Sequence, residues 1–227
     1  MQQPKQILII DDDQQIREIS AEYLRNNEFT VHTATNGVLA LQLCITHEFD
    51  CILLDLMMPQ MDGETFMTTF RAMKNTPIII NSARIDDDDK VHFLELGADD
   101  YIVKPTNLRE LVARINAVIR RTTQTNDVTF TSDKLRINPS NRSVIINEKT
   151  IALTHTEYLV LASLMAQAGQ TVSRYDLVHM VFQDTSMFSN YRTIDVHIYN
   201  LRKKIERDVD NPEFIITVYG AGYRYNA

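Results

Sequence analysis

The feature that most constrains the fold is a series of five short apolar runs in the first half of the chain, separated by helical patterns. Three of the runs are apolar throughout, as expected of central parallel strands that are covered on both faces. Five strand–helix units in about 120 residues predict an α/β domain with a doubly wound, five-stranded parallel sheet. The predicted strands are residues 6–10, 30–33, 51–54, 77–80 and 101–103.

Polar side chains follow several of these runs. In a doubly wound sheet, functional groups gather beyond the carboxyl ends of the strands, where Asp11, Asp12 and Asp55 are expected to meet. Three neighbouring carboxylates repel each other unless a cation neutralises them, and all-oxygen ligands favour a hard cation such as Mg²⁺. The pattern therefore predicts Asp55 as a nucleophile toward phosphorus, with Lys104 as a second positive group and Ser82 as a hydroxyl donor.

The second half of the chain is organised differently. Residues 122–127 are polar and follow an amphipathic helix predicted over 107–121, so they are interpreted as a linker. Strand-like runs at 128–131, 134–138, 143–146 and 150–153 come next. Three helical stretches then begin near Thr154, Ser173 and Arg192, and the chain ends in a predicted hairpin over 214–225. We therefore expect two domains, residues 1–121 and 128–227.

Charge is distributed unevenly along the chain, which has a net charge of -7. Residues 1–121 hold 12 basic and 19 acidic residues, whereas residues 122–227 hold 11 of each. Five basic residues lie within 192–207, so a neutral second domain with one basic helix is typical of DNA binding. No apolar run reaches the roughly 18 residues that span a bilayer, and the first residues are not a signal peptide. We expect a cytoplasmic protein that does not bind membranes.

Four segments carry a specific resemblance: ILIIDDD, LLDLMMPQMDG, PIIINSAR and GADDYIVKP, in this order. Residues 5–121 strongly resemble bacterial response-regulator receiver domains. The resemblance implies a flavodoxin-like fold, a cis Lys104–Pro105 peptide, and phosphorylation of Asp55 by a sensor histidine kinase. It also implies that Mg²⁺ is held by Asp11, Asp12, Asp55 and the backbone carbonyl of Met57, that Lys104 clamps the phosphate, and that Ser82 and Tyr101 form the switch.

Receivers of the OmpR/PhoB family pair through their fourth helix, fifth strand and fifth helix, and this sequence resembles them there. The resemblance implies a homodimer on phosphorylation, although a solvated charged face also explains such residues, since exposed ion pairs contribute only about 0–1 kcal/mol each. Thr106 departs from the family, which commonly has Phe after Lys-Pro. The implied cross-subunit pairs are Lys90 with Glu110, Asp100 with Arg114, and Asp99 with Arg121.

Residues 192–207 place four apolar residues on one helical face and leave the opposite side free to enter a major groove. Together with the later string TVYGAGYRY they resemble the winged helix-turn-helix effector of the OmpR/PhoB family, an α+β domain that covers residues 128–227. This implies promoter DNA as a partner, and RNA polymerase through the loop Phe182–Asn190. The candidate DNA contacts are Arg192, Thr193, Val196, His197, Tyr199, Asn200, Arg202, Lys203, Lys204, Tyr219, Tyr223 and Arg224.

These features predict a two-component transcription factor that is not an enzyme, apart from slow self-phosphorylation and self-dephosphorylation. Two other hypotheses stand beside it. A phosphatase of the haloacid-dehalogenase type also uses an aspartate nucleophile, but needs a second Asp two residues later, where Met57 stands. A DNA-binding regulator with an atypical receiver would act independently of phosphorylation. Tyr199, Asn200 and Tyr219 replace arginines common in the family, which predicts weaker nonspecific DNA attraction, or an affinity that depends on dimer pairing.

Overall fold

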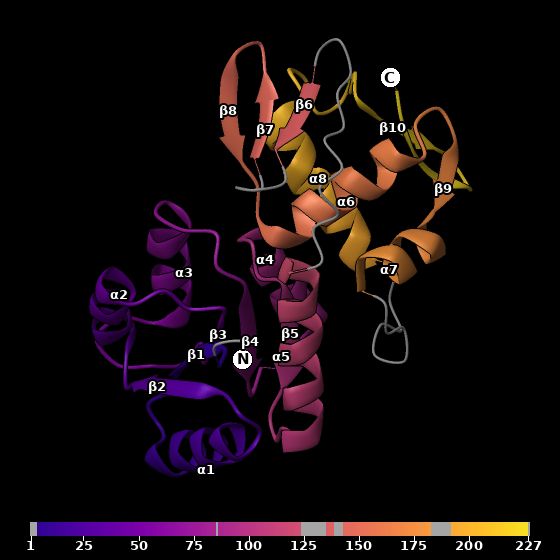
Figure 1. The fold of residues 1–227 in the computed structure, drawn as a ribbon. Helices are drawn as coiled ribbons and strands as arrows, with labels where there is room; N and C mark the ends of the chain where they lie inside the picture. The colour runs from indigo at the N-terminus through magenta and orange to yellow at the C-terminus, as the bar shows by residue number, and fades with distance from the viewer. Residues whose placement is uncertain (1–3, 85, 124–134, 139–142, 183–191, 227) are drawn as a thin grey trace. The chain divides into compact units, whose positions relative to one another are not determined.

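The computed structural model describes residues 4–84, 86–123, 135–138, 143–182 and 192–226 (Figure 1). The chain divides into two compact units, residues 1–120 and 121–227. The last helix of the first unit, α5, spans Leu108–Thr123, so residues 122 and 123 of the predicted linker are helical. The rest of that linker and the strand predicted over 128–131 lie outside the described residues. No helix in the described parts is long and apolar enough to cross a membrane.

The first unit contains a parallel sheet with the strand order β2–β1–β3–β4–β5, which confirms the predicted doubly wound fold. Central strands β1 and β3 are covered on both sides, and this is why their sequences are almost wholly apolar. Strand β4 runs two residues beyond its predicted end. The strands are β1 Gln6–Ile10, β2 Thr30–Ala34, β3 Cys51–Leu54, β4 Ile78–Ser82 and β5 Asp100–Val103.

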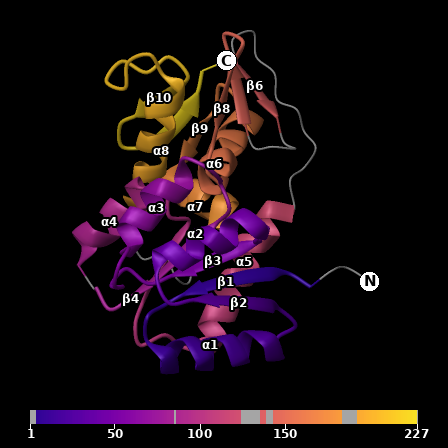
Figure 2. The ribbon, with the colours of Figure 1, turned by 90° about the vertical axis from the view of Figure 1, so that its left-hand side faces the viewer.

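Helices cover both faces of this sheet. Leu24 of α1 and Leu111 of α5 belong to one buried cluster with Ile79 of β4, so these two helices share a face. Figure 2 shows α1 on one side of β1 and β2, and α2 on the other. The carboxylate of Asp13 accepts hydrogen bonds from the amides of Gln15 and Ile16, and therefore caps the start of α1. The remaining bounds are α1 Gln14–Asn26, α2 Gly37–Thr46, α3 Gly63–Arg71 and α4 Asp87–Glu95.

In its described residues the second unit combines three helices with two antiparallel sheets, which confirms the predicted winged-helix class. Strands β6, β7 and β8 form a meander, and the last sheet has the order β10–β11–β9. Strand β9 was not predicted, because three residues are too few to show an alternating pattern. The elements are β6 Leu135–Asn138, β7 Ser143–Ile146, β8 Lys149–Ala152, α6 His155–Ala166, β9 Thr171–Ser173, α7 Arg174–Phe182, α8 Arg192–Ile205, β10 Ile215–Val218 and β11 Gly222–Tyr225.

Two local features hold these elements in place. Thr154 and Glu157 form a capping box at the start of α6, each side chain bonding to the backbone of the other residue. Gly222 has φ +155°, and a Cβ atom there would lie only 2.0 Å from the carbonyl oxygen of Val172. Only glycine permits β11 to approach β9 so closely.

Candidate functional site

Three carboxylates meet at the carboxyl ends of neighbouring strands. Asp11 and Asp12 follow β1, and Asp55 follows β3, which pairs with β1 in parallel. One oxygen atom from each carboxylate lies within 4.8 Å of the other two. Asp11 and Asp55 are buried, whereas Asp12 is exposed, so the group opens to solvent on one side. We call these three residues the acid cluster; the sequence predicted that they meet.

Lys104 reaches the acid cluster from the end of β5. Its ammonium donates to Asp11 Oδ2 at 2.9 Å and to Asp55 Oδ2 at 2.5 Å. Burial raises the pKa of Asp11, and the hydrogen bond from Lys104 offsets this only in part. Burial also acts to lower the pKa of Lys104, but its hydrogen bonds to Asp55 and Asp11, together with its electrostatic attraction to both, outweigh that effect and raise it. The peptide bond between Lys104 and Pro105 is cis, as predicted.

The second oxygen of Asp55 is held by the loop that follows β3. Asp55 Oδ1 accepts hydrogen bonds from the amides of Leu56 at 2.6 Å and Met57 at 3.3 Å. The carboxylate is therefore oriented from both sides, by backbone amides and by Lys104. Beside it lies a cavity of about 440 Å³, lined by Leu56, Met57, Met58, Asp62, Glu64, Arg84 and Phe93.

The two predicted switch residues both contact the loop after β4. Ser82 is fully buried, and its hydroxyl accepts from the amide of Arg84 at 3.4 Å. The Tyr101 hydroxyl donates to the carbonyl of Arg84 at 3.1 Å. Burial raises the pKa of Tyr101, so it stays a neutral donor. Sequence reasoning missed Arg84, because nothing local indicates that its backbone joins these two side chains.

Thr106 has a clear structural role although it departs from the family pattern. Its hydroxyl donates to the buried side-chain oxygen of Asn81 at 2.5 Å. Asn81 lies in β4 immediately before Ser82, so this bond ties the segment that carries Lys104 to the strand that carries Ser82. No signal in the sequence indicates the pair, since the two residues are 25 positions apart.

Some of the charged residues predicted to pair across a dimer form hydrogen bonds and ion pairs within the chain. Arg114 bonds to both carboxylate oxygens of Asp100, at 3.0 and 2.8 Å, and also to Glu110. The prediction for Asp99 is corrected: it is 1% exposed and accepts from Arg71 and from the amide of Ile78, because it closes the start of β4. Lys90 is half-buried, and the side chain of Arg121 lies outside the described residues.

Several residues predicted to contact DNA are exposed on α8 and on the hairpin of β10 and β11. Tyr199 is 46% exposed, and the ammonium of Lys203 lies 5.3 Å from its ring centre. Tyr219, at the tip of the hairpin, is 94% exposed. Thr193 and Arg224 are half-buried, and the side chain of Arg192 lies outside the described residues.

Three other α8 residues do not present the surface that the sequence predicted. Val196, His197 and Asn200 are only 8%, 1% and 6% exposed. His197 lies on the flank of the apolar stripe of α8 and packs against Phe182 of α7, their ring centres 6.2 Å apart. Helical periodicity alone predicts which residues form the apolar stripe of α8. It does not show that neighbouring helices also bury residues beside that stripe.

Three more residues predicted to contact DNA, Arg202, Lys204 and Tyr223, form bonds inside the unit. Arg202 donates to the carbonyl of Ile215 and to the hydroxyl of Thr217. Lys204 pairs with the buried carboxylate of Glu157 at 2.6 Å. Tyr223 is 4% exposed, and its hydroxyl donates to Asp195 at 2.7 Å.

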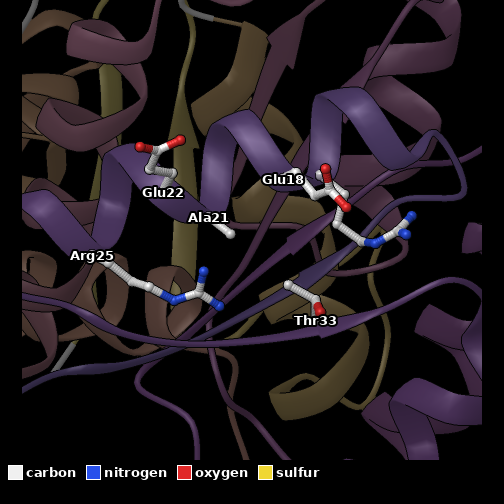
Figure 3. Close-up of a pocket in the computed structure, with 6 residues that line it drawn as sticks. Glu18, Ala21, Glu22, Arg25 and Thr33 are labelled. Carbon is white, nitrogen blue, oxygen red and sulfur yellow. The ribbon is translucent and has the colours of Figure 1, made fainter.

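A second cavity, of about 380 Å³, lies between α1 and β2 (Figure 3). Arg17 on its wall donates to the carbonyl oxygens of Asp11 and Asp12, and Arg25 donates to the carbonyl of Val31. These guanidinium groups brace the backbone around the cavity, and acids of the same helix stand beside them. The lining residues are Arg17, Glu18, Ala21, Glu22, Arg25 and Thr33.

Two family models match the chain. Residues 7–116 match the response regulator receiver domain, and residues 148–225 match the C-terminal domain of transcriptional regulatory proteins. The matches cover the unit that holds the acid cluster and the unit that holds α8 and the final hairpin. This order of domains, and not either domain alone, makes the chain a transcriptional response regulator.

Relatives match over nearly the whole chain. The probable transcriptional regulator ycf27 of Cyanidium caldarium is 38% identical, with 96% of this chain and 92% of the relative covered. The transcriptional regulatory protein SrrA of Staphylococcus aureus is 36% identical, with 97% of this chain and 95% of the relative covered.

Among solved structures, a RitR mutant matches with a TM-score of 0.84 and 27% identity, covering 98% of this chain and 99% of that chain. DrrB, an OmpR/PhoB homologue of Thermotoga maritima, matches with a TM-score of 0.53 and 28% identity, covering 99% and 100%. The chain therefore belongs to the OmpR/PhoB family of two-component response regulators, which control transcription.

Proposed function

We propose that Asp55 accepts a phosphoryl group from a sensor histidine kinase in the cytoplasm, and that this modification controls the binding of promoter DNA by the second unit. The observation that carries the proposal is the charge balance at Asp55. Its carboxylate is buried, held by two backbone amides on one oxygen and by Lys104 on the other. A carboxylate oriented in this way suits in-line attack on phosphorus, which depends on positioning and charge neutralisation.

The residues of the acid cluster fit a Mg²⁺ ion, because they supply three carboxylates as hard oxygen donors and one side open to solvent. In our proposal Asp11, Asp12, Asp55 and the backbone carbonyl of Met57 hold the ion. When bound, Mg²⁺ neutralises charge on the phosphoryl oxygens. A carboxylate oxygen of Asp55 forms the new bond to phosphorus while the bond between phosphorus and the donor breaks, and Lys104 then pairs with the phosphoryl group.

The proposed output runs through the loop after β4. A phosphoryl group on Asp55 offers an acceptor to the Ser82 hydroxyl. The hydrogen bonds that Ser82 and Tyr101 form with the backbone of Arg84, in the loop after β4, then change. We propose that the receiver dimerises on phosphorylation through Lys90 with Glu110 and Asp100 with Arg114. RNA polymerase is a further proposed partner, through residues 182–190, of which 183–190 lie outside the described residues.

Phosphate-affinity electrophoresis tests the proposal directly. The full chain is incubated with acetyl phosphate and Mg²⁺, beside Asp55→Asn and the control Asp86→Asn, which changes an exposed acid without a side-chain capping bond. We expect a shifted band with the wild type and the control, and no shift with Asp55→Asn or with EDTA. A shift that survives Asp55→Asn would move the modification elsewhere. No shift in any lane, with the same result when a histidine kinase is the donor, would favour a regulator that is independent of phosphorylation.

A further inference from the structure

A group of polar side chains joins α7, α8 and β11 within the second unit. Asp195 Oδ1 accepts hydrogen bonds from Arg174 Nε and from the Tyr223 hydroxyl, both at 2.7 Å. Arg174 also donates to the Tyr223 hydroxyl at 3.3 Å, and its guanidinium carbon lies 4.8 Å from the centre of the Tyr223 ring. We call Arg174, Asp195 and Tyr223 the Asp195 cluster. One residue comes from each of the three elements, so the cluster fixes their relative positions.

Helix α8 is attached to the hairpin at a second point, near its other end. Arg202 donates to the carbonyl of Ile215 and to the hydroxyl of Thr217, both in β10. Thr217 is the cross-strand neighbour of Tyr223, and the Arg202 guanidinium lies 5.8 Å from the Tyr223 ring centre. Asp195 and Arg202 are two turns apart on α8, so the two attachments define both the tilt and the rotation of the helix against the hairpin.

Within the Asp195 cluster, Tyr223 and Arg174 are the hydrogen-bond donors and Asp195 is the acceptor. Burial raises the pKa of Tyr223 to about 12, and the hydrogen bond to Asp195 adds to the effect, so the hydroxyl remains a donor at any physiological pH. Burial acts to lower the pKa of Arg174, but the hydrogen bonds and electrostatic interactions with Asp195 and Tyr223 together outweigh this and raise it. Asp195 therefore faces two donors that keep their protons, and hydrogen bonds from a charged guanidinium are shorter and stronger than those between neutral groups.

We propose that the Asp195 cluster is a specificity-determining device for DNA binding: it sets the angle of α8 against the β10–β11 hairpin, and thereby which bases the exposed residues of α8 can reach. Tyr199 lies one turn beyond Asp195 on α8, and its exposed ring moves with any rotation of the helix. Base-edge contacts tolerate little misplacement, whereas phosphate contacts read no sequence. The three residues are thus positioning residues, and the proposal rests on the DNA-binding function of the family.

The test compares affinity for a preferred duplex with affinity for a scrambled one. The wild-type full chain first selects a duplex from a random pool, and dissociation constants are then measured by fluorescence anisotropy at one salt concentration. The variants are Tyr223→Phe, Asp195→Asn and the double variant. Two matched controls lie in the same unit: Tyr175→Phe changes an exposed tyrosine, and Asp210→Asn removes the same charge as Asp195→Asn from an exposed loop.

We expect each cluster variant to lower the ratio of preferred to scrambled affinity by about tenfold, the size of one mismatched base pair. The double variant should lose little more than the more affected single variant, because Tyr223→Phe removes, and Asp195→Asn weakens, the same bond. Destabilised folding alone would lower both affinities equally and leave the ratio unchanged. Ratios equal to those of Tyr175→Phe and Asp210→Asn would overturn the proposal. A wild type that selects no duplex would overturn the DNA-binding function too, before any variant is compared.

Discussion

At the scale of single residues, Lys104 determines the charge balance of the acid cluster. Its side chain is 14% exposed, and those of its partners Asp11 and Asp55 are 4% and 9% exposed. Removing one partner of a buried ion pair leaves the other charge uncompensated, whereas losing an exposed pair has little effect. Lys5 offers the comparison, because its pair with Asp50 is 39% and 28% exposed.

We therefore predict that Lys104→Met lowers the free energy of unfolding by about 3 kcal/mol in the absence of divalent ions. Lys5→Met should lower it by less than about 1 kcal/mol. Adding millimolar Mg²⁺ should restore part of the stability of Lys104→Met, since the ion supplies the missing positive charge. Urea unfolding followed by circular dichroism, with and without Mg²⁺, measures both effects. Equal losses in the two variants, or a Lys104→Met variant that Mg²⁺ leaves unchanged, would contradict the charge-balance account.

The residues that the sequence placed correctly at the acid cluster share one property. Asp11, Asp55 and Lys104 each follow a strand directly, and parallel strand ends meet at one edge of a sheet whatever the loops do. Asp99 was misplaced for a different reason: its burial depends on Arg71, which is 28 positions away. The same distance problem hid the Asp195 cluster, because Arg174 and Tyr223 are 49 positions apart.

At the scale of elements, the close approach of β9 and β11 makes the two hairpin glycines unequal. A Cβ atom at Gly222 would meet the carbonyl of Val172 at 2.0 Å, whereas nothing lies within 4 Å of one at Gly220. Both residues have positive φ, so both alanine variants bear some backbone strain. We predict a loss of about 1–2 kcal/mol for Gly220→Ala. Gly222→Ala should lose more than about 4 kcal/mol, because the strands must separate.

Thermal unfolding of the second unit, followed by near-ultraviolet circular dichroism, distinguishes the two glycine variants. Gly220→Ala should retain a cooperative transition shifted by a few degrees, and Gly222→Ala should lose or strongly lower it. Similar midpoints for both would mean that β9 and β11 are not in close contact in solution. The pairing of β9 with β11 gives a second reason why β9 was not predicted. It depends on Gly222, which is about fifty residues later in the chain.

Patterns that repeat within one element were predicted well, and contacts between elements were not. The five parallel strands were each predicted from a run of neighbouring apolar residues, and all five are present. The exposed face of α8 was predicted from helical periodicity alone. His197 and Asn200 are buried there because a helix that touches several neighbours has a buried arc wider than its apolar stripe.

At the scale of the whole molecule, the uneven charge makes the proposed dimerisation important for the proposed binding of DNA. The excess of acidic residues lies in residues 1–121, while the remainder is neutral, so a single chain has little long-range attraction for DNA. Joining two second units through their receivers makes the second DNA contact intramolecular, which raises affinity by effective concentration without any new contact. Affinity for a duplex with two half-sites should then rise on phosphorylation far more than affinity for one half-site.

Charge reversal on the proposed dimer face tests this link. Lys90→Glu would face Glu110 of the partner subunit, and like charges across an interface oppose association. We predict that acetyl phosphate with Mg²⁺ produces dimers of the wild type and of the control Lys5→Glu in sedimentation velocity, but not of Lys90→Glu. Adding Glu110→Lys to Lys90→Glu should restore dimers in part, because the second change also removes an acceptor of Arg114 within the chain. Affinity for the duplex with two half-sites should follow the dimer fraction across the four proteins.

Dimerisation of Lys90→Glu equal to that of the wild type would place the interface elsewhere. Tight binding to the duplex with two half-sites in the absence of dimers would show that DNA affinity does not depend on receiver pairing.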